Sequence, residues 1–211
     1  MGKIAQGAFG GVSGTVGNLV GSSWKGIDYF RIKADHYHDA HTEPQVNQRN
    51  RFSGILGMCS LLREEVINPI WKHKAVQMTP SNLFTQVNMQ AFGDDGNVGD
   101  WSLLKLTVGT LPIPFNMKIA DNPDTPKTID VSWSTSQLSG KKREDDQLML
   151  ILTDGKGDWC MMTTLEAYRK DEEASIMLPY EPGMTVHVYA FFASPKLDRF
   201  SESFHTEVVL S

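Results

Sequence analysis

Residues 184–193 read MTVHVYAFFA, and residues 147–153 read QLMLILT. Short runs rich in β-branched and aromatic residues predict β-strands. In the first run the valines and Phe192 point to one side of such a strand, whereas Tyr189 and Phe191 point to the other. A strand with large apolar side chains on both sides is covered on both faces. We therefore expect two central strands whose second face lies under the N-terminal segment, a helical segment or a neighbouring subunit.

Period-2 patterns recur around these two runs, at the spacing typical of a β-sandwich. Residues 128–134 (TIDVSWS) alternate apolar and polar side chains, as a strand with one buried face does. We expect a tight hairpin turn at Asp154–Gly157 and an immunoglobulin-like or fibronectin type III-like β-sandwich over residues 94–211. The expected strands are 103–108, 115–120, 128–134, 147–153, 158–163, 175–178, 184–193 and 204–210.

Residues 42–93 change to helical spacing. A cap threonine with a proline in the first turn occurs at Thr42 and again at Thr79, and each predicts a helix start. The first helix is expected to end at Asn68–Pro69 and the second at Gly93–Gly96. Such a helical pair is too small to be stable unless it packs on the rest of the chain. The fold class is therefore mainly β (α+β).

Residues 1–41 hold eight of the eighteen glycines, interleaved with apolar residues rather than serine. A flexible linker would be polar, so these apolar side chains require a cover. We expect an extended arm in which residues 24–32 pair as a hairpin with residues 15–20. The expected contact residues of the arm are Phe9, Val12, Val16, Leu19, Val20, Trp24, Ile27, Tyr29 and Phe30.

The composition is that of a globular protein, because 40% of the residues are hydrophobic and only 21% are charged. No apolar run reaches the roughly 18 residues that a membrane helix needs. The start of the chain also lacks the apolar core of a signal peptide. We therefore expect a chain that is made and assembled in the cytoplasm without membrane insertion. Cys59 and Cys160 lack metal or redox spacing and predict buried thiols.

Charge is divided unevenly along the chain. Residues 1–93 carry nine lysine and arginine residues against six aspartate and glutamate residues, whereas residues 94–211 carry eleven against nineteen. A basic part and an acidic part could attract each other within an oligomer, or the basic part could meet nucleic acid. The net charge of −5 argues against a dedicated nucleic-acid binder.

Three histidines, His36, His38 and His41, form the metal candidate of the sequence. In an extended segment the first two point to the same side, and imidazole is a common metal ligand. The sequence offers no fourth ligand, so a polar loop is the competing interpretation and no metal is predicted. Residues 94–100 (DDGNVGD) lack the ligand spacing of a calcium loop and predict a turn.

No nucleophile elbow, P-loop or zinc-protease motif occurs in the sequence. Adjacent carboxylates such as Glu64–Glu65 point apart on a helix and cannot act on one substrate. We therefore expect a protein without catalytic activity and without a cofactor.

The opening from Gly7 to Arg31 follows the pattern GxxGGxxGxxGxxVGSSWKGxxYxR, where x is any residue. Further matching positions are Thr42–Glu43, Gln45, Gln48–Arg49, Phe52, Thr79–Pro80, Asn82, Val131–Trp133, Tyr189–Phe192 and Ser203. Through these residues the chain resembles a family of uncharacterised proteins of similar length found in Bacteroidetes. The resemblance implies no catalytic or binding residue. The histidine-rich stretch 35–41 departs from the family pattern, which has basic residues and proline there.

Together these features predict a non-enzymatic structural subunit of a multi-copy assembly, either a phage virion component or a cell-associated filament or layer. The arm would contact neighbouring subunits or complete its own fold, and the sequence leaves both open. The alternative is a monomeric β-sandwich binding module. Carbohydrate is then the first ligand to test, stacked on Tyr189 and Phe191.

Overall fold

A computed structural model describes residues 2–3, 13–36, 39–113, 115–135 and 144–211. The chain divides into two compact units, unit 1 (residues 1–43) and unit 2 (residues 44–211). The predicted arm falls in unit 1. The segments predicted as a helical pair and as a sandwich belong together in unit 2, because they share a core. Among the described residues, none of the helices combines the length and the hydrophobicity of a membrane span.

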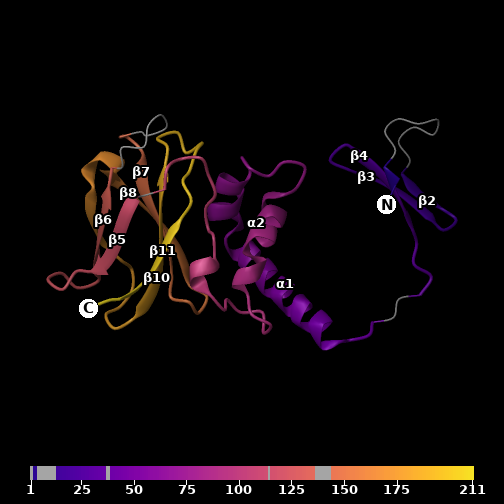
Figure 1. Ribbon diagram of the computed structural model, residues 1–211, viewed down its shortest axis with the longest axis horizontal. Helices are drawn as coiled ribbons and strands as arrows, with labels where there is room; N and C mark the ends of the chain where they lie inside the picture. The colour runs from indigo at the N-terminus through magenta and orange to yellow at the C-terminus, as the bar shows by residue number, and fades with distance from the viewer. Residues whose placement is uncertain (1, 4–12, 37–38, 114, 136–143) are drawn as a thin grey trace. The chain divides into compact units, whose positions relative to one another are not determined.

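Unit 2 contains two antiparallel sheets that form a β-sandwich (Figure 1). One sheet has the strand order β11-β10-β7-β8 and the other β5-β6-β9. The strands are β5 (Phe115–Asp121), β6 (Thr128–Ser134), β7 (Gln147–Thr153), β8 (Trp159–Tyr168), β9 (Glu173–Met177), β10 (Thr185–Ala193) and β11 (Phe204–Val209). This arrangement confirms the predicted sandwich and seven of its eight strands. The hairpin turn between β7 and β8 lies at residues 154–158, as predicted.

The remaining predicted strand, residues 103–108, does not form. Trp101–Leu103 forms a 3-10 turn, η3, and the following residues run without a ladder partner. The side-chain amide of Asn88 takes the place of a neighbouring strand: its Nδ2 donates to the Lys105 carbonyl at 3.0 Å, and its Oδ1 accepts from the Lys105 amide at 2.6 Å. An extended, apolar segment is thus held by a side chain instead of by a sheet.

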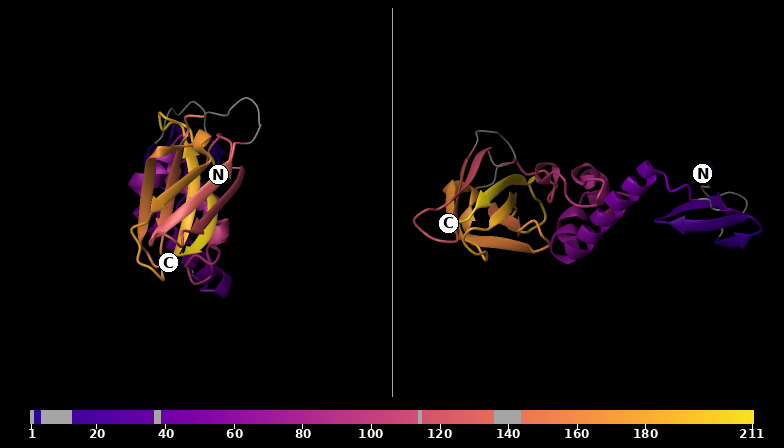
Figure 2. Two further views of the ribbon diagram at one scale, coloured as in Figure 1. Left: turned by 90° about the vertical axis from the view of Figure 1, so that its left-hand side faces the viewer. Right: turned by 90° about the horizontal axis from the view of Figure 1, so that it is seen from below.

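A helical layer covers the outer face of the four-stranded sheet, and in the left view of Figure 2 it lies behind the strands. Its elements are α1 (Glu43–Leu61), the π-helix η1 (Arg63–Trp71), α2 (Pro80–Asn88) and the 3-10 turn η2 (Met89–Ala91). Ile55, Trp71 and Phe84 of this layer pack in one cluster with Met149 and Tyr189 of the sheet. Unit 2 therefore has three layers, one of helices and two of strands.

The central strands β7 and β10 have buried side chains on both faces, as predicted. Leu148, Leu150 and Leu152 of β7 belong to the core between the sheets, whereas Met149 and Ile151 belong to the core under the helices. The sequence left three candidates for the layer that covers the second face of these strands. In the structure, helices of the same unit cover it.

The first helical segment continues past its predicted end at Asn68–Pro69, so that prediction is wrong. The chain widens into a π-helix, in which the Ile67 amide donates to the Leu62 carbonyl five residues back at 2.9 Å. Proline removes only one bond from such a ladder, and the buried Trp71 anchors the far end. The second helix start is confirmed, because the Asn82 amide donates to Thr79 Oγ1 at 3.1 Å.

Unit 1 is a four-stranded antiparallel sheet of order β1-β4-β3-β2. Its strands are β1 (Gly2–Lys3), β2 (Gly14–Val16), β3 (Leu19–Trp24) and β4 (Ile27–Ile32). The predicted pairing of residues 24–32 with residues 15–20 holds only at Leu19 and Val20, because the prediction misplaced the turn between the two strands. The chain reverses at Lys25–Gly26, where φ is +48° and +77°, so that β3 pairs with β4 instead.

Two glycines one helical turn apart in α1 predict opposite effects of alanine. A Cβ on Gly54 would lie 1.8 Å from the Gly96 carbonyl oxygen, whereas a Cβ on Gly57 would meet nothing within 4 Å. Overpacking of a tight contact costs about 1–3 kcal/mol, and alanine gains up to about 1 kcal/mol over glycine inside a helix. Gly54→Ala should therefore lower the free energy of unfolding and Gly57→Ala should raise it, as measured by urea denaturation. Equal effects of the two substitutions would contradict this helix packing.

Candidate functional site

A groove of about 410 Å³ opens on the helical side of unit 2. It lies where α1, the loop of residues 92–101 and the β7–β8 turn meet. Five glycines line it, namely Gly54, Gly57, Gly96, Gly155 and Gly157. Glycine leaves the backbone accessible to a close approach by another chain. The sequence prediction missed this groove, because its lining comes from three segments far apart in the chain.

Most of these glycines have a reason inside unit 2. Gly54 and Gly96 touch through their backbones, and a Cβ on Gly155 would press on the rings of His187 and Trp101 at 3.4 and 3.5 Å. Gly157 has a φ of +126°, which side chains disfavour. Gly57 differs, because it sits in regular helix and has open space around it. Among the described residues of unit 2, none comes close enough to require glycine at this position.

Two tryptophans, Trp101 and Trp159, form the aromatic wall of the groove, with ring centroids 6.1 Å apart. Trp101 is held from behind: its ring stacks on His187 at 4.4 Å with planes 16° apart. Its carbonyl accepts a hydrogen bond from the Tyr189 hydroxyl at 2.8 Å. Nδ1 of His187 lies 3.2 Å from Nε2 of His205, which completes the support. The position of Trp101 is thus fixed by contacts within unit 2.

The predicted ligand face at Tyr189 and Phe191 is wrong. Both side chains are fully buried, because the helical layer covers that face of β10. Tyr189 supports Trp101 from inside, and Phe191 packs near Phe200 with ring centroids 6.3 Å apart. The sequence correctly placed both residues on the side away from Phe192. It could not show that helices already occupy that side.

Three carboxylates directly precede residues that line the groove: Asp95 precedes Gly96, Asp100 precedes Trp101 and Asp154 precedes Gly155. The carboxylate of Asp95 accepts a hydrogen bond from the side-chain Nδ2 of Asn97 at 2.8 Å and another from the backbone amide of Asn97 at 3.0 Å. These bonds lower the pKa of Asp95. The Lys156 amide likewise lowers the pKa of Asp154 by donating to it at 2.8 Å. A hydrogen bond from Ser102 lowers the pKa of Asp100. The lowered pKa values keep these three groups ionised at neutral pH, and the described lining of the groove contains the cation Lys156.

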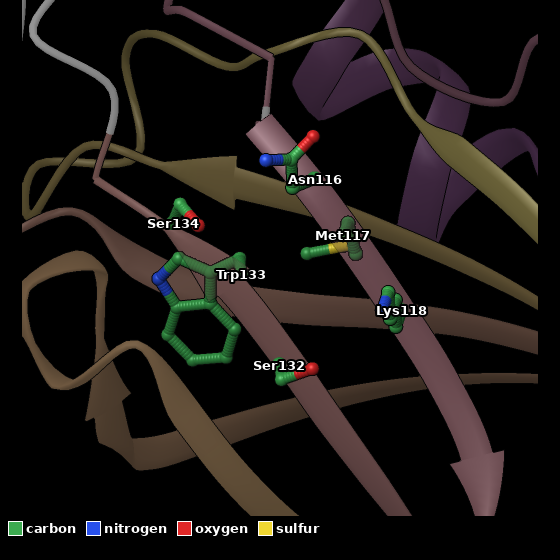
Figure 3. A pocket seen from close by; sticks show the side chains of 6 residues that line it. All are labelled: Asn116, Met117, Lys118, Ser132, Trp133 and Ser134. Atoms are coloured by element: carbon green, nitrogen blue, oxygen red, sulfur yellow. The ribbon is translucent and has the colours of Figure 1, made fainter.

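A second pocket, of about 670 Å³, lies against β5 and β6 (Figure 3). Its described lining is Asn116, Met117, Lys118, Ser132, Trp133 and Ser134. Trp133 is turned into the core, where its Nε1 donates to the Arg169 carbonyl at 2.8 Å. Lys118 is the single charged residue in this lining, so these side chains hold no pair of groups for acid–base chemistry.

The histidine candidate is described at two of its three positions. His36 is exposed, His41 Nε2 lies 3.4 Å from Asp39 Oδ2, and His38 lies outside the described residues. No group of three or more metal-ligating side chains is close enough to hold an ion within the ranges that the structure describes. Cys59 is buried as predicted, and burial raises the pKa of its thiol. Cys160 is only partly buried.

The arm residues form an apolar row across three strands of unit 1. Val16 pairs with Leu19, and Leu19 pairs with Ile32, so the three side chains share one face of the sheet. Their exposed fractions are 73%, 49% and 75%. Trp24 is 42% exposed at the β3–β4 turn, and the Lys25 ammonium lies 5.4 Å from the centre of its ring.

Of the other expected arm residues, Phe30 shares the face of this row, whereas Val20, Ile27 and Tyr29 lie on the opposite face of the sheet. Val20, Ile27, Tyr29 and Phe30 are half-buried. Phe9 and Val12 lie outside the described residues. Over residues 13–36 and 39–43, no apolar side chain is fully buried. The described part of this sheet therefore has no core of its own.

A family model for a family of unknown function (DUF6266) matches residues 11–205. The chain belongs to this family. The expected membership of an uncharacterised family is thereby confirmed, and no catalytic or binding residue comes with it. No curated protein matches the sequence.

Part of the chain is similar to three solved structures. One is the fibronectin type III domain of human collagen XX, with 13% identity, a TM-score of 0.37 and coverage of 49% of this chain and 95% of that domain. A myokine structure has 12% identity, a TM-score of 0.36 and coverage of 48% and 98%. A family 76 glycoside hydrolase from a bovine Bacteroides thetaiotaomicron strain has 12% identity, a TM-score of 0.36 and coverage of 47% of this chain and 20% of the hydrolase. The chain spans a fifth of that enzyme.

The histidine pair behind Trp101 predicts a loss of stability in acid. Burial lowers the pKa of both His187 and His205, and the two rings repel each other when charged, against the weaker pull of Glu207 and Asp100. An unfolded histidine has a pKa of about 6.5, so below that pH the unfolded chain takes up protons that the folded chain does not. Stability is present above about pH 6.5 and is lost as the pH falls toward the folded pKa.

We expect His205→Gln to reduce the fall in the free energy of unfolding between pH 7.5 and 5.5, because one of the two titrating groups is gone. Urea denaturation at the two pH values measures this. His73→Gln, at an exposed histidine, is the matched control and should leave the fall unchanged. An unchanged fall in His205→Gln would show that the buried pair does not govern the acid response.

Proposed function

We propose that the protein is a non-enzymatic structural subunit of a multi-copy assembly and that unit 1 makes the contacts between subunits. The observation that carries the proposal is the exposed apolar row Val16–Leu19–Ile32 on a sheet whose described residues bury no apolar side chain. A sheet becomes stable by covering one face with another layer. A neighbouring subunit supplies such a layer, and covering each large side chain contributes about 1.5–3 kcal/mol.

Two assemblies fit a subunit of this kind, a phage virion component and a cell-associated filament or layer. In both, many copies meet through the same surfaces, and one apolar arm on each copy provides repeated contacts. The competing function, a monomeric module that binds carbohydrate through Tyr189 and Phe191, loses its support because those rings are buried.

The proposal is tested by making the apolar row polar without changing the strands. Val16→Thr with Ile32→Thr replaces two exposed side chains by threonine, which favours strands equally well. Each fully covered side chain contributes about 1.5–3 kcal/mol, and every 1.4 kcal/mol changes an association constant about tenfold. We expect the double variant to associate at least about tenfold more weakly, as measured by light scattering across a concentration series.

The matched control is Met177→Thr with Val209→Thr, which changes two similarly exposed side chains on the sandwich, at 66% and 59% exposure. This control should keep the mass of the unmodified protein. A full chain that is monomeric at every concentration would overturn the proposal. So would a control that dissociates as readily as the arm variant.

A further inference from the structure

We propose that the groove of unit 2 binds the β3–β4 turn of a second copy, with Trp24 as the inserted side chain. This inference rests on the proposed function and adds a separate contact of unit 1, because Trp24 and the apolar row lie at opposite ends and on opposite faces of β3. The turn is two residues long, Lys25 and Gly26, so the end of the hairpin is narrow. Trp24 stands beside it with 42% of its surface exposed.

Gly57 is the first argument that the groove has an occupant. It lies inside α1, where glycine weakens a helix, and no atom of the described part of unit 2 lies within 4 Å of the position that its Cβ would take. Its helical neighbour Gly54 is glycine because the Gly96 backbone touches it. The open space at Gly57 is explained if another chain comes close to the helix there. Any larger side chain at this position would project into the groove.

The walls of the groove match an aromatic side chain. Trp101 and Trp159 line it side by side, and Leu61 of α1, which is 64% exposed, belongs to the same lining. Aromatic rings pack well edge to face or offset against one another. Tryptophan is also among the residues that contribute most where two proteins meet in a desolvated pocket. Trp101 is already fixed by its stack on His187, so little order has to be gained on binding.

Charge is complementary in both directions. Lys25 follows the inserted tryptophan, and Asp95, Asp100 and Asp154 each directly precede a residue that lines the groove. Asp28 lies on the next strand of the hairpin, opposite Ser23, and the described lining of the groove contains the cation Lys156. Opposite charges of this kind fix the register of a contact and speed association.

Docking a turn of one copy into a groove of the next is a head-to-tail contact, because the two surfaces differ. Such contacts generate rings or open filaments. They also allow complementation: a copy with a damaged turn still offers its groove, and a copy with a damaged groove still offers its turn. Two such variants, each monomeric alone, should pair once and then stop.

The experiment uses full chains and light scattering. Trp24→Thr removes the inserted side chain, and Gly57→Leu fills the groove while favouring the helix. We expect each variant alone to have the monomer mass of 23.6 kDa and their equimolar mixture to form a dimer. Ser53→Leu adds the same leucine to an exposed position of α1 that does not line the groove, and it should assemble like the unmodified protein. Lys25→Glu, which leaves the apolar surfaces intact, should weaken assembly at least tenfold at low salt.

The outcomes separate the two proposals. If Gly57→Leu keeps the mass of the unmodified protein, or if the two monomeric variants do not pair, the groove is not the docking surface, although arm-mediated assembly can stand. If the unmodified chain is itself monomeric, both proposals fail. Circular dichroism melting of each variant shows that a loss of mass comes from the contact and not from unfolding.

Discussion

The structure of unit 2 depends on burial of both faces of the sheet β11-β10-β7-β8. Leu150 and Ile151 are neighbours in β7, yet the first packs on the second sheet and the second packs under the helices. Burying each such side chain contributes about 1.5–3 kcal/mol, so removing either outer layer would expose a whole row of them. The helices are therefore part of the core and not an appendage of the sandwich.

This burial also creates the groove. Because α1 packs on the sheet, Gly54 of this helix lies against the loop of residues 92–101, where it touches the backbone of Gly96. The same loop places Trp101 over His187 near the start of β10. Asn88 and Trp71 secure the neighbouring segment, through Lys105 and the Leu106 carbonyl. The packing of the helices on the sheet thus fixes where the groove lies.

Much of the fold could be predicted from the sequence, because strands that pack on a core carry a period of two. The pattern failed where side chains replaced backbone partners, as Asn88 does for residues 103–108. It failed also at Pro69, where a π-helix tolerates a residue that ends an α-helix. The groove gives no local signal, since Gly57, Trp101 and Trp159 come together only after folding. The burial of Tyr189 was foreseen as one possibility, but which layer covered it was not.

The two units differ in how far they satisfy their own apolar residues. Unit 2 closes two cores, whereas the described strands of unit 1 leave Val16 and Ile32 about three-quarters exposed. Hydrogen bonds within a four-stranded sheet pair its backbone N–H and C=O groups, but they do not remove these side chains from water. In the described residues, unit 2 therefore buries many of its large apolar side chains in cores of its own, whereas unit 1 leaves several of its large apolar side chains in contact with water. The exposed apolar surface of the described arm residues is therefore where we direct the search for the role of the protein.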